Sequence, residues 1–203
     1  MIDSQMITFL SLLALLCVAF LVAVSAVGIV SLFNRGLPEP LRPLREGLGA
    51  AALPMAFAVA TVTTAGSLWL SEVEKLPPCY LCWWQRGFMY PQVLILGLAL
   101  IWPKLRWVSL PMVVVGAGIS TYHYLVERFP DDISTACSDS TPCTTVWIWK
   151  YHFLSIPGMA WVAFVTIGVL ILLARPRATS QPEGAADATI GNIDAESEPE
   201  LTR

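Results

Sequence analysis

Charged residues are scarce in this 203-residue sequence: they make up 13% of the chain, against 56% hydrophobic residues. Soluble globular domains usually carry about 25% charged residues, so the composition excludes an ordinary soluble domain. The sequence also lacks a glycine-rich phosphate-binding loop, and its 12 Lys and Arg residues are too dispersed for a nucleic-acid surface. These absences indicate an integral membrane protein that contacts lipid and no nucleic acid.

No Lys or Arg precedes the first apolar run, Met6 to Phe33. A secretory signal has a basic start and a shorter apolar core, so we interpret this run as a retained transmembrane helix. Cys17 lies within it and is assigned a packing role only. Pro54, in the next span, is expected to kink its helix. The further spans are expected at residues 47–70, 81–102, 107–126 and 153–174.

Basic residues are distributed unevenly around these spans. Seven of the 12 Lys and Arg lie at three junctions, residues 34–46, 103–106 and 175–177. Since Lys and Arg gather on the cytoplasmic side of a membrane, the N-terminus and the other two loops are expected outside. The acidic C-terminal residues 178–203 lack aromatic side chains and are expected to form a disordered cytoplasmic tail. The predicted fold class is an all-α polytopic membrane protein.

Two cysteines, Cys79 and Cys82, stand at the head of the third span, directly after Pro77-Pro78. Proline is tolerated in the first turn of a helix, so the proline pair marks a helix start. Arg86, at i+4 from Cys82, is expected on the same helix face as both cysteines. Because the helix dipole and the guanidinium group both favour a thiolate, we expect a reactive cysteine of low pKa here.

A second pair, Cys137 and Cys143, lies in the loop between the fourth and fifth spans. All four cysteines are thus expected outside the membrane, where disulfides form and persist. A structural disulfide in the loop, a zinc site and redox exchange between the pairs all remain open. The membrane location favours redox exchange, because structural zinc pairs usually occur in soluble ribbon-like folds.

Several motifs occur together between residues 50 and 175. They are Pro78-Cys79-Tyr80-Leu81-Cys82-Trp83-Trp84-Gln85-Arg86, Met89-Tyr90-Pro91, Tyr122-His123-Tyr124-Leu125, the Cys-x5-Cys of the outer loop and Ser155-Ile156-Pro157. In combination they resemble the DsbB family of disulfide-forming quinone reductases, most closely its BdbC branch. The resemblance implies a four-helix transmembrane bundle in a bacterial cell membrane. The expected regions are 1–46, an additional N-terminal helix and cytoplasmic linker; 47–177, the four-helix domain; and 178–203, the tail.

The resemblance also implies a function. It suggests a thiol oxidase that takes electrons from a thioredoxin-fold partner of the DsbA or BdbD kind and passes them to a membrane quinone, either ubiquinone or menaquinone. In this scheme Cys137 and Cys143 exchange with the partner, and Cys79 and Cys82 then receive the electrons. Cys82 would reduce the quinone while Arg86 stabilises the negative charge. The activity would support disulfide formation in exported proteins.

Two further residues are candidate quinone contacts. Gln85 is able to donate a hydrogen bond to a quinone carbonyl, or alternatively to join two helices. His123 is able to stabilise a quinone oxygen or relay a proton, or alternatively to bond to backbone at the interface. Trp147, Trp149 and Tyr151 are interpreted as an interfacial anchor. No metal ligand is assigned.

Two alternatives come from other classes of protein. An enzyme similar to vitamin K epoxide reductase also couples a membrane Cys-x-x-Cys to a quinone, but Arg86 and the loop spacing fit the DsbB family better. A non-enzymatic membrane scaffold would use the cysteines as structural disulfides or for a metal. Quinone reduction that depends on Cys82 would separate an enzyme from a scaffold.

Overall fold

The structure is a computed structural model that describes residues 4–33, 42–131, 137, 142–151 and 154–175. Its helices are α1 (Ser4–Phe33), α2 (Arg42–Glu72), α3 (Tyr80–Ala99), the short 3-10 helix η2 (Pro103–Leu105), α4 (Arg106–Arg128) and α5 (Ile156–Leu173). Within the described residues, β pairing is limited to one bridge between Lys150 and Leu154. The predicted all-α class is confirmed. The predicted tail lies outside the described residues.

Four helices, α1, α2, α4 and α5, are long and apolar enough to cross a membrane. The remaining long helix, α3, is not among these candidate spans, and its first half is rich in Trp and Tyr and contains Gln85 and Arg86. It nevertheless packs along α2 and α4 as a full member of the bundle. The prediction of a polytopic membrane protein is confirmed.

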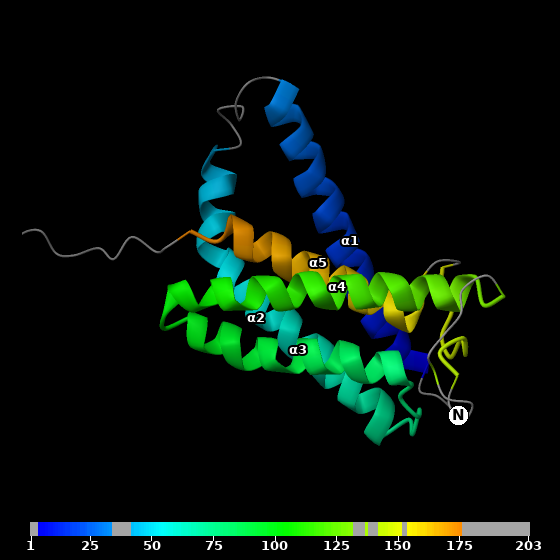
Figure 1. Ribbon diagram of the computed structural model, residues 1–203. Coiled ribbons are helices and arrows are strands. Elements are labelled where there is room, and N and C mark those ends of the chain that lie inside the picture. The colour runs from blue at the N-terminus through cyan, green and yellow to red at the C-terminus, as the bar shows by residue number, and fades with distance from the viewer. Residues whose placement is uncertain (1–3, 34–41, 132–136, 138–141, 152–153, 176–203) are drawn as a thin grey trace, which may run out of the picture.

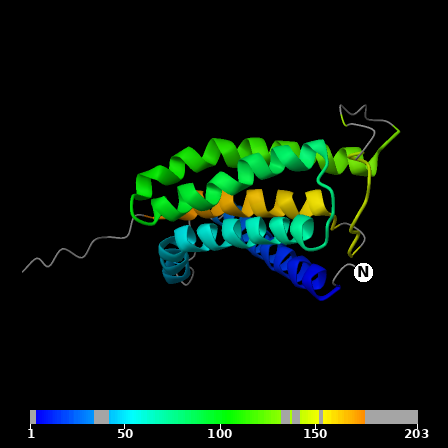
Figure 2. The ribbon, with the colours of Figure 1, turned by 90° about the horizontal axis from the view of Figure 1, so that it is seen from below.

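Helices α2 to α5 form a closed ring, in which each helix packs along two neighbours (Figures 1 and 2). The core between α2 and α5 pairs large side chains with small ones. Ala52, Ala56 and Ala60 of α2 and Phe164 and Ile167 of α5 are fully buried there. Small residues let two helix backbones approach closely, which is how helices gain contact energy where lipid replaces water.

The two ends of the bundle carry different segments. The start of α1, the connection between α2 and α3 and the loop after α4 gather at one end, whereas η2 and the end of α5 lie at the other (Figure 1). The predicted outer loops therefore share one end of the molecule, and two of the predicted inner junctions share the opposite end.

Two helices begin three or more residues away from their predicted starts, and the other three within two residues. Helix α2 begins at Arg42, so that Arg42 and Arg45 lie in its first turns and not in the linker. It contains Pro54 and changes direction in its N-terminal half (Figure 1). Helix α5 begins at Ile156, because the Ser155 side chain accepts a hydrogen bond from the backbone N–H of Gly158 and so caps the helix.

The additional helix α1 packs mainly on α5. Near the start of α1, Ile7 is buried in a cluster with Leu70 and Ile148. From Leu21 onward none of its residues is buried, and the helix diverges from the bundle (Figure 1). Only the first half of α1 is therefore part of the packed structure.

Helix α4 lies close to α5 at Gly116. A Cβ atom added there would come within 2.4 Å of the Phe164 ring, which is fully buried. A side chain at Gly118, two residues further along α4, would meet no atom within 4 Å. The position of the Phe164 ring therefore requires a glycine at residue 116, whereas residue 118 has room for a side chain.

We expect Gly116→Ala to destabilise the protein by about 1 to 3 kcal/mol, because the Phe164 ring must move out of a packed core. Gly118→Ala is the matched control, and should be neutral or slightly stabilising since alanine favours the helix. Thermal unfolding of both variants in detergent measures the difference. Equal melting temperatures for the two would contradict the described packing.

Candidate functional site

Cys79 is the N-cap residue of α3. Its backbone is extended, with φ −73° and ψ 172°, and its sulfur accepts a hydrogen bond from the backbone N–H of Cys82 at 3.3 Å. A cap of this kind satisfies one of the unpaired N–H groups in the first turn of a helix. The two preceding prolines lie just outside the helix, which begins directly after Cys79. The predicted helix start at the cysteine pair is therefore observed.

The sulfur atoms of Cys79 and Cys82 lie 2.7 Å apart. Both cysteines are free thiols in this structure, and Cys79 is buried. A disulfide bond is about 2.05 Å long, so a small side-chain movement would join the two sulfurs. The spacing of the pair is compatible with a disulfide bond between them.

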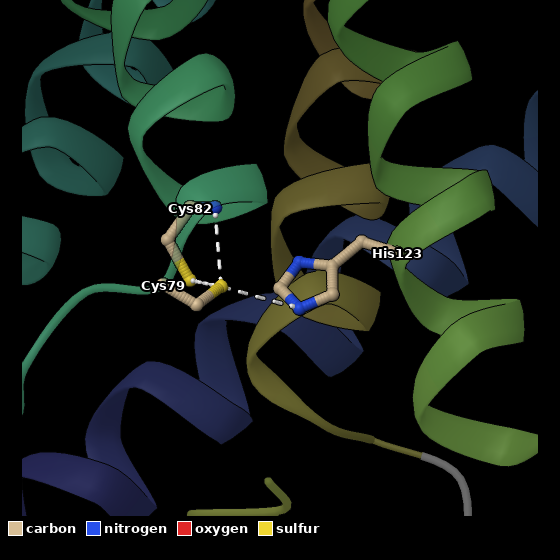
Figure 3. Close-up of side chains that lie close together, drawn as sticks. All are labelled: Cys79, Cys82 and His123. Carbon is tan, nitrogen blue, oxygen red and sulfur yellow. Dashed lines mark hydrogen bonds between the residues drawn. The ribbon is translucent and has the colours of Figure 1, made fainter. Parts of the chain in front are cut away.

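His123 of α4 meets this pair from the neighbouring helix. Its Nε2 lies 3.6 Å from the Cys79 sulfur (Figure 3). Its Nδ1 lies 3.2 Å from the amide nitrogen of Gln85. With the Gln85 amide donating to Nδ1, a neutral imidazole carries its proton on Nε2, which faces the sulfur. Gln85 and His123 thus form a buried chain that ends at Cys79.

The low-pKa cysteine is Cys79, which precedes α3. A hydrogen bond from the Cys82 side chain is the main cause, and with His123 it outweighs the opposing effect of burial and lowers the pKa of Cys79 to about 4. We expected a low-pKa cysteine at this helix start, and the resemblance suggested Cys82 as the thiolate. In the state described, the thiolate is favoured at Cys79 because the Cys82 thiol, the His123 imidazole and the cap N–H all point to that sulfur.

The second pair, Cys137 and Cys143, forms a disulfide with a Cα–Cα distance of 5.9 Å. Cys143 is buried in one apolar cluster with Cys79, and Cys82 and Cys137 pack against the same cluster. The loop pair, 55 or more residues away along the chain, thus lies over the first turn of α3. All four cysteines that the sequence singled out meet in one place.

A zinc site fits this arrangement poorly. The ligand atoms of Cys79, Cys82 and His123 lie within 4.8 Å of one another, close enough to reach one ion. Two thiolates bound to tetrahedral zinc at about 2.3 Å would stand about 3.8 Å apart, whereas these sulfurs are 2.7 Å apart. Cys137 and Cys143 are bonded to each other and are not available as thiolate ligands. The geometry is that of one disulfide and one pair of closely spaced thiols.

Arg86 contacts α2, whereas His123 reaches the cysteine pair from α4. Its Nη2 donates to the backbone carbonyl of Ser67 on α2 at 3.1 Å, and its guanidinium carbon lies 5.6 Å from the centre of the Trp83 ring. Tyr90 donates its hydroxyl hydrogen bond to the Ser67 side chain at 3.3 Å. These contacts hold the guanidinium group of Arg86 beside α2.

A cavity of about 340 Å³ lies between α1, α2, α3 and α5. Cys82, Gln85 and Arg86 line it, together with mostly apolar side chains from the other three helices. Its size lies within the range of about 300 to 1,000 Å³ that is typical of small-molecule sites. His123 is not among the lining residues, so it contacts the cysteine pair and its predicted contact with a quinone stays a prediction.

Sequence reasoning missed two groups at this site. Glu127 is buried one helical turn after His123, and one of its carboxylate oxygens has no hydrogen-bond partner in the described residues. Its i+4 spacing from a candidate histidine was the available signal. Trp147, interpreted as an interfacial anchor, also lines the cavity while remaining 41% exposed. No sequence signal separates it from Trp149.

Comparison with known proteins gives one consistent answer. Residues 49–174 match the family described as "Disulfide bond formation protein DsbB". A "Probable disulfide formation protein" of Oceanobacillus iheyensis is 45% identical over 118 residues, which are 56% of this chain and 81% of the relative. The "Probable disulfide formation protein C 1" of Bacillus anthracis is 41% identical over 128 residues, 62% of this chain and 92% of the relative.

A third relative has a similar relation to the chain. The "Disulfide bond formation protein C" of Bacillus subtilis is 38% identical over 122 residues, which are 59% of this chain and 88% of the relative. No solved structure matches the chain at a significant level. The family match covers more than half of the sequence, including both cysteine pairs and all of α3, α4 and η2. The chain therefore belongs to the DsbB family of disulfide bond formation proteins.

Proposed function

We propose that this protein is a membrane dithiol oxidase that reoxidises a thioredoxin-fold partner outside the membrane and passes the electrons to a membrane quinone. The observation that carries the proposal is the meeting of both cysteine pairs in one apolar cluster, with Cys82 also lining the cavity. Its relatives are named as disulfide formation proteins, which supports the same class of reaction. The product would be disulfide bonds in exported proteins.

The first step is thiol–disulfide exchange at the outer loop. A thiolate of the reduced partner attacks the Cys137–Cys143 disulfide, forms a mixed disulfide and releases the other loop sulfur as a thiolate. The partner's second thiol then resolves the mixed disulfide, so that the partner leaves oxidised and the loop pair is left as two thiols. Two electrons and two protons have then moved from the partner to the loop.

The second step transfers the electrons to the pair at the start of α3. With Cys79 and Cys82 oxidised, a loop thiolate attacks Cys79, and a second exchange restores the loop disulfide and leaves two thiols on α3. The shared cluster supports this step, because Cys143 and Cys79 are buried in it together. His123, at 3.6 Å from the Cys79 sulfur, is placed to hold or release the proton of that thiol.

The residues around the cavity fit a quinone. The lining is largely apolar, and its polar groups, which include Cys82, Gln85 and Arg86, are concentrated along one face of α3. A quinone bound there would accept two electrons and two protons and become a quinol. Arg86 would stabilise negative charge at the ring oxygen, and its place near the outer end of α3 keeps the cost of burying the guanidinium small.

The orientation we propose puts both cysteine pairs outside the cytoplasmic membrane of a bacterium and the C-terminal tail inside. The segments that carry the cysteines share one end of the bundle in Figure 1, whereas η2, which contains Lys104, and the end of α5 lie at the other. Disulfides also persist on the outer side and not in the cytoplasm.

Labelling tests this orientation. A membrane-impermeant maleimide added to intact, reduced cells should react with Cys137 or Cys143, because the loop is outside. A cysteine introduced as Ser180→Cys should react only after the cells are lysed. Labelling of residue 180 in intact cells would reverse the topology and remove the basis for an external partner.

The electron transfer is tested with purified protein, a reduced dithiol partner and a quinone. We expect one quinol for each partner disulfide, and a fall to the uncatalysed rate in Cys82→Ser, because the inner pair can no longer cycle. Arg86→Met should raise the KM for quinone about tenfold, the size expected for losing one hydrogen bond to a charged group. Arg106→Met is the matched control, since Arg106 also lies over a Trp ring, 5.1 Å away, but not at the cavity.

Two results of that assay would count against the proposal. Quinone reduction that survives Cys82→Ser would place the reaction elsewhere, and equal effects of the two arginine variants would remove the special role of Arg86. A protein that binds partner and quinone but transfers no electrons would be a scaffold.

The order of events at the loop is tested by trapping. In Cys143→Ser, a partner that keeps only its attacking cysteine is supplied as its mixed disulfide with thionitrobenzoate. The Cys137 thiolate should attack the partner sulfur, release thionitrobenzoate and stay bound to the partner, because no second loop thiol can break the new disulfide. Mass spectrometry of the adduct locates the bond, and Cys137→Ser is the control. Adducts that form in Cys137→Ser but not in Cys143→Ser would exchange the two roles. No adduct in either variant would make the loop disulfide structural.

A further inference from the structure

One wall of the cavity comes from α1, which lies outside the family match that begins at residue 49. Leu10, Leu13, Ala14 and Cys17 of α1 line the cavity. Their spacing of i, i+3, i+4 and i+7 makes them a single stripe along one face of the helix. Residues on other faces of the same turns, Phe9, Leu12 and Leu16, are 50% to 67% exposed. The helix therefore turns one defined face toward the cavity.

Specific contacts hold α1 in this position. A Cβ atom at Gly66 of α2 would lie 2.9 Å from Leu10, so the two helices meet where α2 has no side chain. Toward the outer end, Ile7 is buried with Leu70. Further along, Cys17 lies against Thr166 of α5. Contacts on both sides of the cavity thus fix the stripe opposite α3.

The stripe extends deeper than the polar groups of the site. Leu10 lies level with Gly66, which is next to Ser67, the residue that accepts the hydrogen bond of Arg86. At a rise of about 1.5 Å per residue, Ala14 and Cys17 lie about 6 and 10 Å further from the outer end. Past Arg86, α1 supplies the apolar side chains Leu13 and Ala14 and one thiol to the wall.

We infer that α1 is a built-in part of the quinone site and that its stripe seats the hydrocarbon chain of the quinone. This inference rests on the proposed function, since it takes the ring to lie beside Cys82 and Arg86. With the quinone ring in that position, the hydrocarbon chain of the quinone would run along Ala14 and Cys17, where the cavity offers apolar contacts. The additional helix thus acts as a specificity element of the redox site.

Protection of Cys17 from alkylation tests the inference without measuring activity. In the fully oxidised protein Cys17 is the only thiol among five cysteines. A fully substituted decyl-benzoquinone, which cannot add to thiols, is supplied at ten times its Kd. Alkylation of Cys17 by N-ethylmaleimide should then slow about tenfold, because about one-tenth of the sites remain free. In the double variant Cys17→Ser, Leu16→Cys the new thiol faces away from the cavity and should react at the same rate with or without the quinone.

A substitution that fills part of the cavity gives a second test, which measures the affinity for the quinone. Ala14→Phe should raise the Kd for the decyl-benzoquinone about tenfold, as expected for a ring forced into occupied space. Leu16→Phe, on the exposed face of the same helix, should change the Kd less than about twofold. Exchange with the reduced partner should be the same in both variants, because the loop cysteines are not in contact with this wall.

The outcomes are separable. Binding of the quinone with no protection of Cys17 and no effect of Ala14→Phe would overturn the role of α1 and leave the proposed function standing. Equal weakening by Ala14→Phe and Leu16→Phe would also overturn it, because the effect would not depend on the stripe. Absence of quinone binding in the unmodified protein would overturn the proposed function, and this inference with it.

Discussion

The hydrogen bond from the Cys82 backbone N–H to the Cys79 sulfur fixes the geometry on which the site depends. It makes a reactive sulfur into the cap of α3, so that the start of the helix and the redox centre are one structure. Because α3 begins there, Cys82 lies in its first turn. Gln85 and Arg86 follow about one turn later. The same bond holds the sulfur in the field of the helix N-terminus, which favours its thiolate form.

Two pairs of buried polar groups link α3 to α4 at different levels of the bundle. Gln85 of α3 bonds to His123 of α4, and Gln92 of α3 accepts a hydrogen bond from Ser109 of α4. Unpaired polar groups are costly in a bilayer, so such bonds also fix the rotation and depth of α3 against α4. The hydrogen-bond chain that reaches Cys79 is thus supported by the same helix pairing that builds the bundle.

The sequence predicted well the features that depend on neighbouring residues. The proline pair and the spacing of Cys79, Cys82 and Arg86 were sufficient to predict where α3 starts, and long apolar runs predicted the membrane class. The contact between Cys79 and His123 joins residues 44 apart, and depends on how α3 and α4 pack. The cavity-facing stripe of α1 was also not predictable, because α1 is apolar on all sides and its pattern does not show which face is covered. Family resemblance did not help there, since it begins after α1.

The divergence of α1 from the bundle beyond Leu21 leaves the inner half of its length without a buried side chain. A hydrocarbon chain that reaches the cavity from that direction comes from the membrane and not from water. Its transfer from lipid to an apolar wall changes its surroundings little, so apolar contact area adds little affinity by itself. Selectivity among lipid-soluble molecules then depends on the shape of the wall and on the few polar atoms of Gln85 and Arg86. A modest intrinsic affinity is sufficient, because such a ligand is already concentrated in the membrane.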